Sequence, residues 1–212
     1  MGPTRVLATG IIPPAVELAP SAVLGLLANM YLCQPTAEAV GNWREIMSRG
    51  GEPLNRLSDA LEQIDATSSE EMGDLLWDYT RLFVGPYRLP CPPWESVYTS
   101  QKRLLLQEAA DGVETAYARL GVQLGAPNVL PDHVGAELNF MGILLEKVEA
   151  DPKEKEACRQ LAKSFLEEHL ANWIPRFASD IEKAAETTVY KALAQATTRT
   201  LDQTAALLID ES

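Results

Sequence analysis

Apolar side chains recur at steps of three and four residues along most of this 212-residue chain. That spacing places them on one face of an α-helix, and no segment shows the alternation of a half-buried strand. The clearest stripe lies in residues 69–83, with Met72, Leu75, Leu76, Tyr79, Leu82 and Phe83. The pattern predicts an all-α fold, a single-domain helical bundle.

Prolines, glycines and capping residues mark the ends of the predicted helices. The expected ranges are 22–33, 36–47, 53–64, 69–83, 100–110, 113–120, 133–148, 152–170, 176–185 and 188–209. Ser68 with Glu71 and Asp151 with Glu154 fit capping boxes, and Asp132 is expected to cap the helix that follows it.

Two further breaks are expected from local sequence. Asp111-Gly112 predicts a pause in one helix, and Trp173-Ile174-Pro175 predicts a corner between two helices. Both predictions depend on glycine and proline being poor residues for a helix interior.

The chain is acidic and has a length suited to one domain. Its 30 acidic and 18 basic residues give a net charge of −12, which argues against nucleic-acid binding because that requires a cationic face. Residues 1–212 are interpreted as one helical domain with an irregular segment at 1–20. Three widely spaced cysteines are expected to be reduced thiols, and no apolar run is long enough for a membrane span or a signal peptide. We therefore expect a cytoplasmic protein.

Residues 85–99 are the segment least compatible with regular structure. Four of the eight residues from 86 to 93 are prolines, which lack a backbone N–H and favour extended geometry. The segment nevertheless carries Tyr87, Trp94 and Tyr98. We expect a rigid loop in which Trp94 either anchors the loop on the bundle or forms a wall of a peptide groove.

Patterns for catalysis and metal binding are mostly missing. There is no phosphate-binding glycine loop and no nucleophile elbow. His133 and Glu137 share a helix face, which we interpret as a structural or ligand-facing contact, and Asp74 and Asp78 are interpreted as a solvated acidic face. No cofactor or metal is expected. Two alternatives stay open: a small helical metal- or carboxylate-dependent enzyme using Asp74, Asp78 or Glu137, and a ligand-sensing helical regulator.

Three sequence blocks together resemble one known family. They are Tyr79-x-x-Leu82-Phe83-x-Gly85-Pro86, Pro92-Pro93-Trp94-Glu95-Ser96-Val97-Tyr98, and Pro131-Asp132-His133 at a helix start. The combination resembles the TorD/DmsD/NarJ family of redox enzyme maturation proteins over about residues 22–185. The resemblance implies an all-helical cytoplasmic chaperone without catalytic activity. Such a chaperone binds the catalytic subunit of a molybdopterin-containing oxidoreductase, often through its twin-arginine leader, assists cofactor insertion and delays export.

The resemblance also implies where the leader binds. The matching positions are Tyr79, Leu82, Phe83, Pro93, Trp94, Asp132 and His133. We expect Glu95, with Asp74, Asp78, Asp132 and Glu137, to supply carboxylates for arginine contacts. An apolar groove edged by carboxylates suits a leader with a basic head and an apolar stretch.

The resemblance leaves the client open. The proline-rich block is more similar to the DmsD branch, whereas Leu130-Pro131-Asp132-His133 is more similar to the nitrate reductase branch. We expect a monomer, with a domain-swapped dimer as the alternative.

Overall fold

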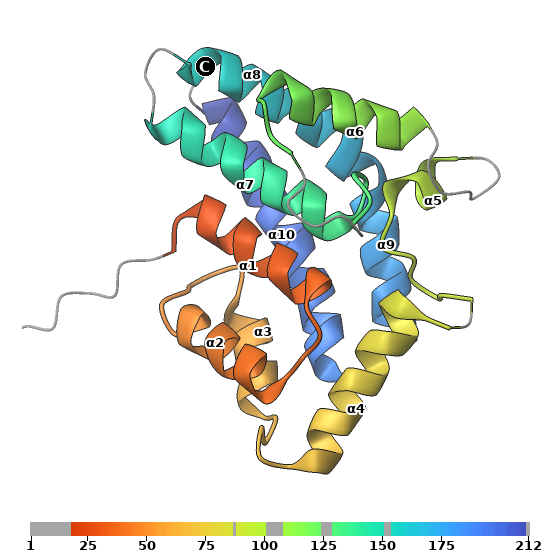
Figure 1. Ribbon diagram of the computed structural model, residues 1–212. Coiled ribbons are helices and arrows are strands. Elements are labelled where there is room, and N and C mark those ends of the chain that lie inside the picture. Colours follow the sequence, from red (N-terminus) through yellow and green to blue (C-terminus); the bar gives the residue numbers. More distant parts are fainter. Residues whose placement is uncertain (1–17, 87, 101–107, 124–128, 151–153, 211–212) are drawn as a thin grey trace, which may run out of the picture.

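The structure is a computed structural model that describes residues 18–86, 88–100, 108–123, 129–150 and 154–210. Its elements, shown in Figure 1, are α1 (Pro20–Leu32), α2 (Ala37–Met47), α3 (Asn55–Glu62), α4 (Ser69–Tyr79), the π-helical turn η1 (Thr80–Val84), α5 (Glu95–Thr99), α6 (Glu108–Arg119), α7 (Val134–Ala150), α8 (Lys155–Phe165), the π-helical turn η2 (Leu166–Leu170), α9 (Ala171–Ala184) and α10 (Thr188–Asp210). The predicted all-α class is confirmed.

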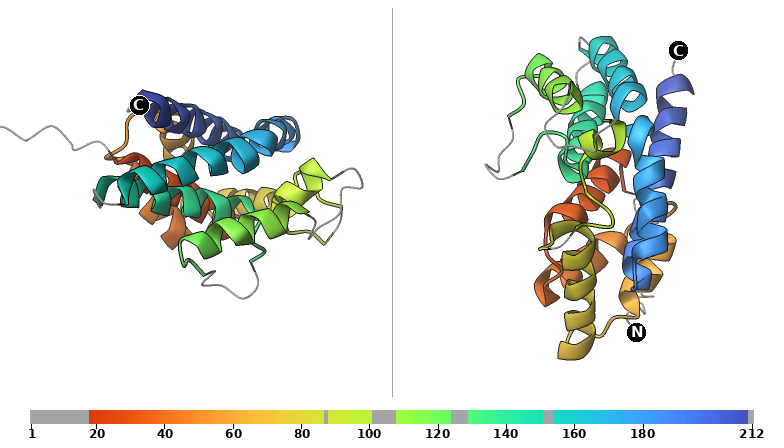
Figure 2. Two further views of the ribbon diagram at one scale, coloured as in Figure 1. Left: turned by 90° about the horizontal axis from the view of Figure 1, so that it is seen from above. Right: turned by 90° about the vertical axis from the view of Figure 1, so that its right-hand side faces the viewer.

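The helices pack in two layers. In one layer α1 packs on α7 and α7 on α8, and in the other α9 and α10 run side by side, as Figure 2 shows. Helices α2 and α3 pack on each other at one end of the bundle, and α3 contacts α10. Helix α5 contacts both α6 and α9. No helix in the described residues is long and apolar enough to cross a membrane.

An aromatic cluster joins the two layers. The ring centroid of Tyr31 on α1 lies 5.7 Å from that of Phe83 on η1 and 5.6 Å from that of Phe177 on α9. Tyr190 on α10 lies 5.7 Å from Phe83. The four side chains are almost inaccessible to solvent, so the end of the α4–η1 helix is anchored in the core.

The two expected breaks are absent, and both predictions are wrong. Helix α6 continues through Asp111 and Gly112, and α9 contains Pro175. A Cβ atom at Gly112 would lie 3.0 Å from the His169 ring, so glycine here allows α6 to approach η2. The π-helical turn η2 directly precedes α9, and such turns often accompany a change in the helical hydrogen-bond pattern.

The expected caps and the loop are partly as predicted. The Ser68 hydroxyl accepts a hydrogen bond from the Glu71 N–H over 3.3 Å, but the Glu71 carboxylate accepts from the Asp65 N–H over 2.7 Å and does not close the capping box. Residues 95–99 are helical as α5, so the loop is shorter than the expected range of 85–99. The predicted cap at Asp151 and residues 1–17 lie outside the described residues.

Helices α1 and α7 approach closely because α7 carries two glycines on one face. A Cβ atom at Gly135 would lie 2.5 Å from Leu32 Cγ and 2.9 Å from the Ala28 carbonyl oxygen. At Gly142 it would lie 3.1 Å from the Ser21 carbonyl oxygen. The contact therefore requires glycine more strongly at position 135 than at position 142.

Replacing Gly135 with alanine should destabilise the protein by about 1–3 kcal/mol, because overpacking forces a shift of the α1 backbone. Urea denaturation measures the change. The matched control is Gly41→Ala on α2, where a Cβ meets no atom within 4 Å. The control should stabilise slightly through its helix propensity, and equal stability of the two variants would refute the close-contact explanation.

Candidate functional site

Backbone hydrogen bonds fix the proline-rich segment to the start of α7. The Glu95 N–H donates to the Asp132 carbonyl oxygen, and the Val134 N–H donates to the Pro93 carbonyl oxygen, each over 2.9 Å. Prolines have no backbone N–H and cannot donate such bonds themselves. These two hydrogen bonds therefore form a short bridge that attaches the proline-rich segment to the rest of the protein.

Trp94 and His133 face each other across the bridge. Their ring centroids are 6.1 Å apart in an edge-on arrangement, and both side chains are half-buried. The His133 Nδ1 atom accepts a hydrogen bond from the Gly135 N–H over 3.1 Å, so the ring proton lies on Nε2. Burial lowers the pKa of His133 to about 4. His133 is therefore neutral at physiological pH and presents one N–H donor.

Asp132 caps a different helix from the one expected. Its Oδ2 atom accepts a hydrogen bond over 3.0 Å from the N–H of Ser96, in the first turn of α5, and the side chain is fully buried. The prediction that Asp132 caps the helix following it is therefore corrected. The carboxylate orients α5 and the neighbouring Trp94, and it is inaccessible to a ligand.

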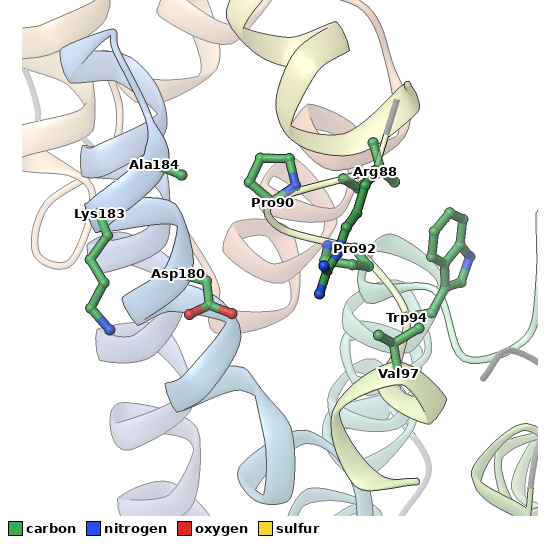
Figure 3. A pocket seen from close by; sticks show the side chains of 9 residues that line it. Arg88, Pro90, Pro92, Trp94, Val97, Asp180, Lys183 and Ala184 are labelled. Carbon is green, nitrogen blue, oxygen red and sulfur yellow. The ribbon is translucent and has the colours of Figure 1, made fainter. Parts of the chain in front are cut away.

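A cavity of about 700 Å³ opens beside Trp94. Figure 3 shows that the loop and α5 form one side and the end of α9 forms the other. The loop side is lined by Pro90, Pro92, Trp94 and Val97, and in the view of Figure 3 the Trp94 indole extends from the loop on the side away from α9. The α9 side presents Asp180, Lys183 and Ala184, and Arg88 extends from the loop between the two sides. The arrangement is a mainly apolar pocket with a few charged groups.

The charged residues of this pocket were missed by the sequence interpretation. Asp180 and Lys183 lie on α9, about ninety positions beyond Arg88 in the chain. No local motif marks them, because only the packing of α9 against the proline-rich segment brings them to the cavity. Since two of the three are cations, the pocket is not the acidic groove that we expected.

Three of the predicted leader-binding residues lie in the core instead of the pocket. Leu82 is fully buried, and Tyr79 and Phe83 are each only 4% exposed. The Tyr79 hydroxyl donates to the Tyr31 carbonyl oxygen over 3.0 Å. In this structure their side chains belong to the core and are not accessible to a peptide. Pro93 is buried as well.

Asp78 is a structural residue and not part of a solvated face. Its Oδ2 atom accepts hydrogen bonds from the backbone N–H groups of Glu186 and Thr187 over 3.0 and 2.8 Å. Its Oδ1 atom pairs with Arg81 over 2.7 Å. Asp78 thus fixes the turn before α10, while Asp74 is exposed as expected.

Glu95 and Glu137 are also enclosed. Glu95 Oε2 lies 2.8 Å from His169 Nδ1, and the Trp173 Nε1–H donates to Glu137 Oε2 over 3.1 Å. Both carboxyl groups are buried, so neither edges the pocket. Burial and the nearby Glu95 and Asp132 charges raise the pKa of Glu137 well above its usual value. Within the described residues, no cluster of histidine, cysteine and acidic groups is suited to a metal ion.

The chain is similar to a group of known proteins. A family model described as nitrate reductase delta subunit matches residues 44–179. The Tat proofreading chaperone DmsD of Salmonella typhi is 35% identical over 156 residues, which cover 72% of this chain and 71% of that protein. The chaperone protein TorD of Photobacterium profundum is 27% identical over 144 residues, 66% of each chain.

A solved structure has the same fold. It is a crystal structure of an Archaeoglobus fulgidus protein assigned to redox enzyme maturation, with a TM-score of 0.61 and 19% sequence identity. The match covers 88% of this chain and 95% of that chain.

Replacing Glu137 with glutamine should remove a pH-dependent loss of stability. The unfolded glutamate releases its proton near its ordinary pKa of 4.5, whereas the folded one retains it to higher pH. The native state then binds more protons, so the wild-type free energy of unfolding falls as pH rises from about 4.5 through the folded pKa. Glutamine keeps an oxygen for Trp173 and cannot ionise.

Urea denaturation between about pH 5 and about pH 8 measures this difference. The variant should gain stability relative to wild type as pH rises. Glu146→Gln, at an exposed position on the same helix, is the control and should run parallel to wild type. A Glu137→Gln profile parallel to wild type would contradict the proposed protonation.

Proposed function

Since the chain belongs to the nitrate reductase delta subunit family and is a redox enzyme maturation chaperone of the TorD/DmsD kind, we propose that the pocket beside Trp94 binds the leader of a molybdopterin-containing oxidoreductase. The chaperone holds this client in the cytoplasm, assists cofactor insertion and delays export. The chain itself catalyses no reaction.

The observation that carries the proposal is the cavity beside Trp94. Its volume of about 700 Å³ is sufficient for several apolar side chains of a peptide. Pro90, Pro92 and Val97 give it rigid apolar walls, and rigid walls lose little conformational entropy on binding. The apolar stretch of a leader fits such a cavity better than its basic head does, because Arg88 and Lys183 repel a second cation.

The buried members of the predicted site act by positioning. Asp132 holds the first turn of α5, and Pro93 holds the start of α7, so both fix the position of Trp94 between them. His133 presents its Nε2–H beside Trp94, where it can donate to a peptide carbonyl oxygen. A monomer suffices for this function, because residues of one chain line the pocket.

The pocket is tested by removing a wall and by filling the cavity. Isothermal titration calorimetry measures binding of a synthetic leader probe, a peptide with two adjacent arginines followed by a leucine- and alanine-rich stretch. Trp94→Ala removes the aromatic wall, and Ala184→Leu occupies the space. Each should weaken binding by about tenfold or more, as loss of a central interface contact does.

Ala206→Leu, the same substitution at an exposed position of α10, is the control for the second variant. It should bind the probe as wild type does. If both pocket variants retain wild-type affinity, the leader does not bind in this cavity.

A further inference from the structure

Trp77 is exposed in a way that the other described tryptophans are not. Its side chain is 57% exposed, whereas Trp43 and Trp173 are buried and Trp94 is half-buried in the pocket. One exposed apolar side chain is ordinary, whereas a contiguous exposed apolar patch marks an interaction surface. Val84, seven residues later on the same continuous helix, is 55% exposed. Because η1 is a π-helical turn with more residues per turn than an α-helix, Val84 is rotated from the Trp77 face and extends the exposed apolar surface to the end of the helix.

The face of α4 that carries Trp77 also carries two exposed carboxylates. Glu70 and Asp74 precede Trp77 by seven and three residues, and both are exposed. Side chains four apart on a helix lie about 6 Å from each other, a separation that two neighbouring guanidinium groups can match. Among the described residues neither carboxylate makes an ion pair. We refer to Glu70, Asp74 and Trp77, with Val84 beyond them at the end of η1, as the α4 stripe.

The α4 stripe changes from acidic to apolar along its length. Its acidic end lies in the first turns of α4, and its apolar end lies at the end of η1. The fourteen steps from Glu70 to Val84 correspond to about 21 Å along the helix axis. An extended peptide of about six or seven residues covers that distance. The opposite face of α4 is buried in the bundle, with Leu75 and Tyr79 inaccessible to solvent.

The apolar end of the α4 stripe borders the pocket. Arg81, which lies between Trp77 and Val84, donates a hydrogen bond from Nη2 to the Ala184 carbonyl oxygen over 2.6 Å, and Ala184 lines the pocket. Beyond Val84 the chain turns at Gly85, with φ of 105°, and continues to Arg88 in the pocket. Figure 3 shows the end of this helix directly above Arg88. The stripe and the pocket therefore form a continuous surface.

We propose that the α4 stripe is the second half of the leader-binding surface. The basic head of the leader binds Glu70 and Asp74, the following apolar residues cover Trp77 and Val84, and the apolar stretch ends in the pocket beside Trp94. This inference rests on the proposed function and adds the direction in which the leader is bound. It also places the arginines where the structure has accessible carboxylates, because those of Asp78, Glu95, Asp132 and Glu137 are buried.

The aromatic contact is tested with the synthetic leader probe and a neighbouring control. Trp77→Ala should weaken binding by about tenfold. Leu76→Ala, at the adjacent exposed position about 100° around the helix from Trp77, should leave the affinity unchanged. Both replaced side chains are solvent-exposed, so both variants should fold, which circular dichroism checks. Wild-type affinity in Trp77→Ala would overturn the inference.

The arginine contacts are tested by a double-mutant cycle between protein and probe. Replacing both probe arginines with glutamine should weaken binding to wild type by at least about threefold, and by much less to the double variant Glu70→Gln/Asp74→Asn. Asp59→Asn/Glu62→Gln on α3, at two exposed acidic positions, is the charge-matched control and should retain the full arginine effect.

The outcomes separate the two proposals. If Asp180→Asn removes the arginine effect and Glu70→Gln/Asp74→Asn does not, the basic head binds in the pocket, and the α4 stripe proposal is wrong while the pocket proposal stands. If wild type does not bind the probe at all, both proposals fall.

Discussion

The bridge between residues 93–96 and residues 132–134 is the contact that holds the candidate site together. A segment with four prolines in eight positions cannot form the repeated N–H to carbonyl pairing of a helix or a sheet. Two backbone bonds and the Asp132 carboxylate supply a fixed attachment instead. Because the attachment lies on both sides of Trp94, the indole is held at the mouth of a cavity and is not free to collapse into the core. The cavity therefore exists before a ligand arrives, which reduces the ordering cost of binding.

Holding the segment in this way places carboxyl groups inside the protein. Glu95, Asp132 and Glu137 lie within one buried region, and a buried charge is costly unless it is paired or neutralised. One carboxyl oxygen of each has a partner: His169 for Glu95, the Ser96 N–H for Asp132 and the Trp173 indole for Glu137. The raised pKa of Glu137 shows that neutralisation also contributes. These acidic residues thus support the candidate site from inside the protein.

Sequence patterns predict the helices well and the accessible surface poorly. The apolar residues from Met72 to Phe83 identify a helix and most of its buried face, because periodicity reports which side of a helix meets the core. Leu76 is the exception, since it is 39% exposed. The family resemblance assigns some of the same residues to peptide binding, although burial of Tyr79, Leu82 and Phe83 follows from that periodicity. Trp77 escapes notice, since one apolar residue on a polar face gives no periodic signal. Gly112 and Pro175 suggest breaks because local propensity ignores the packing that compensates for it.

Local sequence is sufficient for the all-α class, most helix ranges, the proline-rich interruption and, through three blocks of residues, the family. These properties depend on residue spacing and backbone chemistry, which a linear sequence contains in full. Only the packing of the helices reveals that Asp180 and Lys183 meet the proline-rich segment, that Asp132 caps α5, and that Asp78 fixes the turn before α10. Asp132 and Ser96 are 36 positions apart in the chain, and the residues of the other two contacts are more than 90 positions apart. Which distant groups become neighbours depends on how the helices pack together.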